Sequence, residues 1–265
     1  MKAKDTQDLI DRMRQLLMDL KLRTAASELG PCLLKAGCET ALPTVLDVLE
    51  VEAKERDDRR VERQRRASHL PPGKTFETLD QTRLPRALIQ KLEELSRGGW
   101  VEEAANVLAF GLPGVGKSHA AAALGHALIE RGYSVLFTPT FRLVQELLAA
   151  KRDLELPRAL RKLDVFDLVV LDDIGYVQQA PEEVEVLFTL MAERYERRSI
   201  LITSNLVFSE WDRIFRNPMT TAAAIDRLVH HSVILEFNVP SYRTAAARKK
   251  GDTTDTTPDH IEAHP

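Results

Sequence analysis

The sequence of 265 residues is poor in cysteine, with only Cys32 and Cys38. Two cysteines are too few for a disulfide scaffold, and without a nearby Cys or His pair their spacing is not a zinc-binding pattern. We therefore expect reduced thiols in a cytoplasmic protein. The sequence also has no apolar run approaching about 18 residues, which predicts no transmembrane helix and no membrane association. Lys2, Lys4 and Asp5 precede the first apolar run, which is not typical of a signal peptide.

What is present is an ordinary globular composition, in which 44% of the residues are hydrophobic. The length suits one medium-sized domain and a smaller appendage. The formal net charge of −3 predicts no particular partner. The local distribution of charge is more informative, because one stretch of the chain is strongly basic.

The stretch Gly111–Ser118 fits the phosphate-binding pattern G-x-x-x-x-G-K-[ST]. Its glycines allow backbone N–H groups to point at a triphosphate, Lys117 brings positive charge to the β- and γ-phosphates, and the Ser118 hydroxyl can bind Mg²⁺. A predicted strand at 107–110 and a predicted helix from 119 flank the stretch, as such a loop requires. We expect ATP to be bound by Gly111, Pro113, Gly114, Val115, Gly116, Lys117, Ser118 and His119.

Polar residues follow two further predicted strands. Asp172 and Asp173 end the strand predicted at 167–172, at the edge where ligands bind in parallel sheets. We expect Asp172 to hold Mg²⁺ through water and Asp173 to orient the water that attacks the γ-phosphate. Asn205 follows the strand predicted at 199–203, and it can contact the γ-phosphate or that water if its strand lies between the first and the third. The alternative for both motifs is simple turn chemistry.

The first 70 residues predict a small all-helical domain. Leu9, Ile10, Met13, Leu16, Leu17 and Leu20 recur at helical spacing. Gly30-Pro31 predicts a break, and a second helical stretch follows Pro43. The run Pro71-Pro72-Gly73 marks the predicted boundary with an ATPase domain at 71–250. The tail at 251–265 is rich in Asp, Thr, Pro and His, and we expect it to be disordered.

The helical domain ends in a basic stretch. Between Lys54 and Lys74 there are eight Lys and Arg residues against four acids. One interpretation is a helix face that neutralises DNA phosphates, and the other is a solvated helix with i,i+4 ion pairs. No aromatic residue is available to stack on bases, so contacts would be to the DNA backbone. The candidate DNA-binding residues are Arg59, Arg60, Arg63, Arg65 and Arg66.

The remainder of the chain alternates between strands and helices, which predicts an α/β fold with a parallel sheet covered on both faces. A helix is predicted at 84–97, another with Phe141, Val144, Leu147 and Leu148 after residue 138, and another from Pro181. Two short helices are expected near 209–216 and 219–230. The predicted strands are 107–110, 134–138, 167–172, 199–203 and 232–237.

Arg227 lies in the second of these short helices, just before the last predicted strand. A guanidinium cannot lose its proton and offers a planar fork to phosphate oxygens. Arg227 is therefore a candidate arginine finger for the ATP of a neighbouring subunit. A surface ion pair with Asp226 or Glu210 explains it equally well, and Arg213, Arg216 and Arg243 are rival candidates.

These residues together resemble AAA+ ATPases of the IstB/DnaC group, and within that group the IstB helpers encoded beside transposases in bacterial insertion sequences. The similarity covers about residues 5–245. The acidic pair and the phosphate loop are shared by many ATPases, whereas the runs around Trp211 and His230 are more specific. The residues concerned are Gly111–Ser118, Leu171–Tyr176, Arg194–Ser199, Ile202–Leu206, Phe208–Trp211, Ala224–His231 and Ser241–Arg243.

The resemblance implies an AAA+ core with a five-stranded parallel sheet in the order 5-1-4-3-2. It also implies an ATP-dependent homo-oligomer, a ring or helical filament, that assembles on double-stranded DNA, selects or prepares the target site and stimulates a cognate transposase. Only 27 residues follow Asn238, so we expect no full C-terminal lid. The family commonly has Asp-Glu where this chain has Asp172-Asp173, which predicts slow or partner-dependent hydrolysis.

Two other functions share this core. A DnaC-like replicative helicase loader would remodel a protein partner instead of selecting a DNA site. The runs around Trp211 and His230 favour the transposition helper. A small-molecule kinase would need an acceptor pocket, which no sequence feature indicates.

Overall fold

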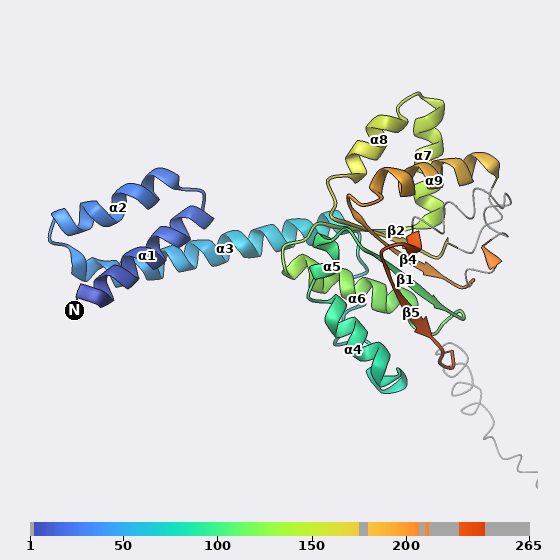
Figure 1. Cartoon of the computed structure of the whole chain (residues 1–265), viewed down its shortest axis with the longest axis horizontal. Helices are drawn as coiled ribbons and strands as arrows, with labels where there is room; N and C mark the ends of the chain where they lie inside the picture. The colour runs from blue at the N-terminus through green and yellow to red at the C-terminus, as the bar shows by residue number, and fades with distance from the viewer. Residues whose placement is uncertain (1–2, 175–179, 207–209, 212–227, 242–265) are drawn as a thin grey trace, which may run out of the picture. The chain divides into compact units, whose positions relative to one another are not determined.

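The computed structural model describes residues 3–174, 180–206, 210–211 and 228–241 (Figure 1). Within the chain there are two compact units, residues 1–63 and 64–265, whose boundary falls inside one helix. The functional boundary near residue 70 stays a prediction, and the tail at 251–265 lies outside the described residues. None of the described helices combines the length and hydropathy of a membrane-spanning segment.

The N-terminal unit is helical, as predicted. It contains α1 (Ala3–Asp19), α2 (Arg23–Lys35), a short 3-10 turn (Glu39–Ala41) and the first part of α3 (Leu42–Ser68). The apolar stripe predicted for the first helix is confirmed, because Met13 and Leu17 are buried in a cluster with Ala26, Leu42 and Leu46. This cluster is the core of the unit.

The predicted break at Gly30-Pro31 is wrong, because α2 continues through both residues. Pro31 removes one backbone donor, but the residue four positions earlier, Ser27, is exposed, so water can bond its carbonyl oxygen. Gly30 is buried where α1 and α2 approach closely, and a Cβ atom there would lie 2.9 Å from Ile10 Cγ2. The glycine therefore permits a helix crossing and does not end the helix.

The second unit alternates between strands and helices, as predicted. The strands are β1 (Asn106–Gly111), β2 (Val135–Pro139), β3 (Leu168–Asp172), β4 (Ser199–Ser204) and β5 (Ser232–Phe237). The helices are α4 (Arg86–Leu95), α5 (Gly99–Glu102), α6 (Lys117–Glu130), α7 (Thr140–Arg152), α8 (Leu156–Leu163) and α9 (Pro181–Arg194), with a 3-10 turn at Gln81–Arg83. The short helices α5 and α8 were not predicted. The helices predicted near 209–216 and 219–230 lie mostly outside the described residues.

The five strands form one parallel sheet in the order β2-β3-β4-β1-β5, which confirms the predicted order 5-1-4-3-2. In this order β4 lies between β1 and β3. Phe110 of β1 pairs with Ser204 of β4, and Leu171 of β3 pairs with Ile202 of β4. All strands end at the same edge of the sheet, and the segments that follow them therefore meet there.

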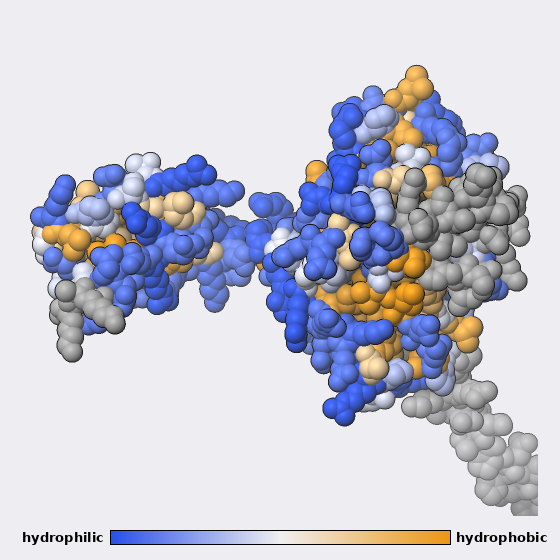
Figure 2. Space-filling model, in the orientation of Figure 1, coloured by the Kyte–Doolittle hydropathy of each residue, from blue (hydrophilic) through white to orange (hydrophobic). Residues whose placement is uncertain are grey.

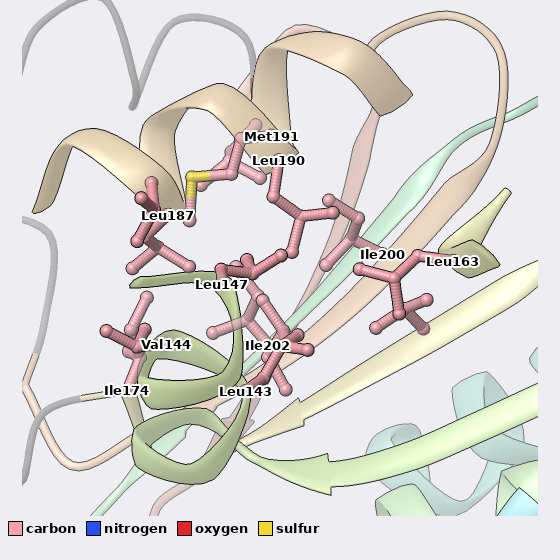
Figure 3. Packing of buried hydrophobic residues seen from close by; sticks show 14 of the residues in the cluster. Leu143, Val144, Leu147, Leu163, Ile174, Leu187, Leu190, Met191, Ile200 and Ile202 are labelled. Carbon is pink, nitrogen blue, oxygen red and sulfur yellow. The ribbon is translucent and has the colours of Figure 1, made fainter. Parts of the chain in front are cut away.

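Helices cover both faces of this sheet (Figure 1). On one face α6 packs a run of buried alanines, Ala120–Ala123, which lets the helix approach the strands closely. On the other face α7 and α9 bury leucines against β4 (Figure 3). The labelled side chains of that core are Leu143, Val144, Leu147, Leu163, Ile174, Leu187, Leu190, Met191, Ile200 and Ile202. Because both faces are covered, the strands read as continuous apolar runs.

Arg194, at the end of α9, is 1% exposed. Its guanidinium donates hydrogen bonds to the carbonyl oxygens of Leu163, Phe166, Asp167 and Ser199. Burial lowers its pKa to about 10, which leaves the guanidinium charged at neutral pH. These bonds connect the segment before β3 to the start of β4.

Arg194→Met should lower the free energy of unfolding of the second unit by about 3 kcal/mol or more, because several buried carbonyl groups lose their donor at about 1–3 kcal/mol each. Arg197→Met is the control: Arg197 is 57% exposed and pairs with Asp164 and Glu193 at the surface, so its loss should cost less than about 1 kcal/mol. Urea unfolding followed by tryptophan fluorescence reports on this unit, which contains both tryptophans. Equal losses in the two variants would contradict the assignment.

Candidate nucleotide-binding site

A cavity of about 390 Å³ opens where β1, β3 and β4 end. Side chains and backbone from four segments line it: the phosphate loop with the start of α6, the residue after β3, the end of β4 and a stretch that precedes α4. The lining residues are Lys74, Thr78, Leu79, Asp80, Pro113, Gly114, Gly116, Lys117, Ser118, His119, Asp173, Thr203 and Asn205.

The phosphate loop connects β1 to α6 through a backbone that only glycine adopts easily. Gly111 has φ +153°, and a Cβ atom there would lie 2.7 Å from the carbonyl oxygen of Phe237 in β5. Gly116, with φ +103°, is the residue before α6 begins at Lys117. The first N–H groups of a helix have no intrahelical partner and lie at its positive end. The loop thus places an anion site inside the cavity.

Lys117 is 6% exposed and fully supplied with acceptors. Its ammonium donates to the carbonyl oxygens of Gly111 at 2.7 Å and Leu112 at 2.9 Å, and to Asn205 Oδ1 at 2.6 Å. These partners offset the cost of burying the charge. An ammonium has three donors, so a bound phosphate must replace at least one of these acceptors.

The acidic pair is oriented by β4. Thr203 is 1% exposed, and its hydroxyl donates to Asp172 Oδ1 at 2.7 Å and accepts from the backbone N–H of Asp173 at 2.8 Å. Asp173 has φ +61°, a left-handed conformation that costs about 1 kcal/mol or more in residues other than glycine. Asn205 donates from Nδ2 to Asp173 Oδ1 at 3.0 Å.

The structure therefore brings together most of the residues predicted for the site. A chain of hydrogen bonds runs from Lys117 through Asn205 to Asp173, and Thr203 joins Asp173 to Asp172. Asp172 does not line the cavity itself but is hydrogen-bonded to Thr203, which does. Arg227, with its rivals Arg213, Arg216 and Arg243, lies outside the described residues.

Two parts of the site were not predicted. Thr203 is a buried strand residue whose role appears only when β4 lies beside β3. The stretch Lys74–Asp80 has no phosphate-binding pattern of its own. It is positioned by packing along α6: His119 Nε2 lies 3.0 Å from both Thr78 Oγ1 and the Thr75 carbonyl oxygen.

This donor set fits a nucleoside triphosphate with a divalent cation. At Gly111 any Cβ atom would collide with Phe237, and the only positive side chain buried at the loop, among the described residues, is Lys117. A hydroxyl and carboxylates are the ligands that Mg²⁺ prefers, and Ser118 would hold the ion from the cavity while Asp172 would hold it through water.

None of the arginines predicted to bind DNA in α3 lines this cavity. The surface of this basic stretch is hydrophilic (Figure 2), and three of the predicted arginines form ion pairs: Arg59 with Glu55, Arg60 with Asp57 and Arg65 with Glu130. Arg63 and Arg66 are exposed. The ion pairs of the second interpretation are therefore present. They lie at the surface, where DNA phosphates could also reach the arginines, as the first interpretation requires.

Comparison with known sequences identifies related ATP-binding proteins. A sequence model of the family described as "IstB-like ATP binding protein" matches residues 19–250. A candidate insertion sequence ATP-binding protein of Sinorhizobium fredii is 46% identical over 250 residues, which is 92% of this chain and 84% of the relative. A candidate ATP-binding protein of insertion sequence IS21 from Pseudomonas aeruginosa is 39% identical over 211 residues, 79% of this chain and 80% of that protein.

Solved structures share the fold at lower identity. DnaA from Aquifex aeolicus, bound to AMPPCP, superimposes with a TM-score of 0.54 at 17% identity, over 72% of this chain and 58% of that one. DnaI superimposes with a TM-score of 0.53 at 18% identity, over 68% of this chain and 98% of that one. At this identity the likeness shows the AAA+ fold alone.

Thr203→Val should raise the Mg²⁺ concentration needed for half-maximal ATP hydrolysis roughly tenfold or more, because groups that orient a metal ligand typically contribute 10–100-fold to metal affinity. Thr203→Ser keeps the hydroxyl and should stay close to the parent. Hydrolysis is measured against Mg²⁺ at saturating ATP. An unchanged Mg²⁺ dependence in the valine variant, with a normal melting temperature, would show that Thr203 only fills space.

Proposed function

Because the chain belongs to the IstB-like ATP-binding protein family and is an ATPase of the AAA+ fold, we propose that it is an ATP-dependent transposition helper that assembles on double-stranded DNA. On DNA it selects or prepares a target site and stimulates a partner transposase. The observation that most supports the ATP-dependent part of this proposal is the hydrogen-bond chain Lys117–Asn205–Asp173, because it connects the phosphate loop to the residue that we propose activates water.

The residues divide the work of hydrolysis in the following way. Lys117 holds the β- and γ-phosphates, and Ser118 and Asp172 would hold Mg²⁺, which would supply additional positive charge to the phosphate oxygens. Asp173 orients and polarises the attacking water. When the γ-phosphate takes the place of Asn205 on Lys117, the amide of Asn205 is released toward the phosphate or the water. Binding of the γ-phosphate thus changes the contacts of Asn205, which is hydrogen-bonded to Asp173.

DNA contact is assigned to the basic stretch of α3. Ion pairs as exposed as Arg59–Glu55 contribute about 0–1 kcal/mol, so DNA phosphates can replace the acids at little cost. Arg63 and Arg66 are exposed and add positive charge that duplex DNA would neutralise. Such contacts release counterions and are independent of sequence.

The partner and the assembly are inferred from the family. The relatives at 39% identity and above are named for insertion sequences, which supports a transposase as partner over a replicative helicase. In a homo-oligomer, an arginine from the neighbouring subunit would stabilise the charge that develops on the γ-phosphate. Arg227 is our candidate, on the sequence argument alone.

The proposed function is tested by assembly on duplex DNA. The parent protein should sediment with DNA in the presence of ATP and release it as ATP is hydrolysed. Asp173→Asn should bind ATP normally, hydrolyse it at least tenfold more slowly and remain on the DNA longer, because the amide cannot accept a proton from water. ADP is the control. DNA binding that is the same with ATP, with ADP and without nucleotide would refute the ATP-dependent helper.

Lys117→Ala should abolish tight ATP binding, because the γ-phosphate loses the only buried cation that the described site offers. Lys74→Ala is the matched control: Lys74 lines the same cavity but is only partly buried, and its loss should weaken ATP binding far less. Binding is measured with a fluorescent ATP analogue. If the alanine variant at Lys117 bound the analogue as the parent does, the phosphate-loop assignment would be wrong.

The combined variant Arg63→Ala, Arg65→Ala and Arg66→Ala should weaken binding to all duplex sequences alike and flatten the dependence of log affinity on log salt by about 0.9 per lost phosphate contact. A charge-matched control replaces three exposed, ion-paired arginines elsewhere, Arg12, Arg142 and Arg158. Fluorescence anisotropy with labelled duplex at several salt concentrations measures the slope. An identical slope in both triple variants would show that the DNA contact does not lie on α3.

A further inference from the structure

Two of the sequence runs that carry the family resemblance do not line the nucleotide cavity, yet they meet in space. Tyr195 and Glu196 come directly after α9, and His230 and His231 come directly before β5. The Tyr195 hydroxyl lies 3.1 Å from His230 Nδ1, and the two histidine rings contact edge-on with centroids 4.3 Å apart. One carboxylate oxygen of Glu196 and one nitrogen from each histidine lie within 4.8 Å of one another.

We propose that Glu196, His230 and His231 bind one divalent transition-metal ion of the Zn²⁺ type. Two imidazole nitrogens and one carboxylate oxygen are a donor set that Zn²⁺ uses in proteins, with water in the fourth position. Tetrahedral bonds of about 2.1 Å place ligand atoms about 3.4 Å apart. All three side chains are exposed, so small rotations about their side-chain bonds close the remaining distance.

Tyr195 provides the supporting contact that such a site requires. A histidine that binds a metal through one nitrogen usually donates a hydrogen bond from the other. With the proton on Nδ1, His230 donates to the Tyr195 oxygen and keeps the lone pair of Nε2 for the metal. The Tyr195 oxygen can accept this hydrogen bond, and metal binding at Nε2 requires this tautomer.

The backbone behind these side chains is well fixed. Asn106, at the start of β1, is 7% exposed and contacts both segments. Its side chain accepts from the N–H of Ile200 and donates to the carbonyl oxygen of Leu228, and its backbone N–H donates to the carbonyl oxygen of His231 at 2.7 Å. Glu196 has φ +54°, which turns the chain directly after α9. Hydrogen bonds from Asn106 therefore fix the backbone close to the three proposed ligands.

The site lies at the edge of the sheet where β4 and β5 begin, opposite the edge with the nucleotide cavity. A bound ion would join the end of α9 to the segment before β5, across the start of β1. Its role is structural: it adds a cross-link between two segments that the nucleotide does not contact. The proposal is independent of the assignment of DNA and transposase as partners.

The test uses the full chain, freed of metal with a chelator and kept free of nucleotide. Zn²⁺ is added alone, and binding is measured by equilibrium dialysis with elemental analysis. The parent should bind one equivalent more tightly than the combined variant His230→Gln and His231→Gln, and Glu196→Gln should weaken that equivalent at least tenfold. Glu193→Gln, an exposed carboxylate at the end of the same helix, is the control and should bind as the parent does. His260 and His264 are present in every variant.

Two further readouts separate a site from solvated histidines. Co²⁺ in place of Zn²⁺ should give the visible absorption of a tetrahedral complex in the parent and lose it in Glu196→Gln. Zn²⁺ should raise the melting temperature of the parent but not of the histidine variant, because only the folded state holds the ligands together. Matching melting temperatures without metal show that the variants fold. Equal Zn²⁺ affinity and stoichiometry in parent and variants would overturn the proposal.

Discussion

The insertion of β4 between β1 and β3 is the constraint on which the site depends. Parallel strands end at one edge, and the register pairs Phe110 with Ser204 and Leu171 with Ile202. The end of β4 therefore lies between the phosphate loop and the acidic pair. From that position Asn205 contacts both Lys117 and Asp173, and Thr203 contacts both acids. In a sheet with β1 beside β3, no side chain of β4 could join them.

Buried polar side chains secure both edges of this sheet. At the edge with the cavity, Thr203 bonds the backbone of Asp173. At the other edge, Arg194 and Asn106 bond backbone groups of the segments that enter β3, β4 and β5. Strands buried on both faces leave unpaired backbone groups where they begin and end, and each such group costs free energy unless a partner is provided. The polar residues are few, but they determine how the loops enter and leave the sheet.

The segment after α3 connects the basic stretch to the cavity within the second unit. Leu70 packs against Gly125 of α6, where a Cβ atom would lie 2.8 Å from Leu70 Cδ2, and the Pro71 carbonyl oxygen lies 3.0 Å from His126 Nε2. The same segment continues to Thr78 and Asp80, which line the cavity. The chain that follows the arginines thus runs along the helix whose first residues form the phosphate site.

The sequence by itself determined the features that depend on neighbouring residues. The phosphate loop, the order of strands and helices and the apolar stripe of α1 follow from local spacing, and each is confirmed in the fold. The prediction of a break at Gly30-Pro31 is wrong because the packing of α2 against α1 outweighed the tendency of both residues to end a helix. Only the tertiary structure decided that Thr203 joins the two acids, that the stretch before α4 closes the cavity and that Glu196 meets two histidines. These groups are 30 or more residues apart in the chain, and only the sheet brings them within contact distance, so no local pattern could reveal them.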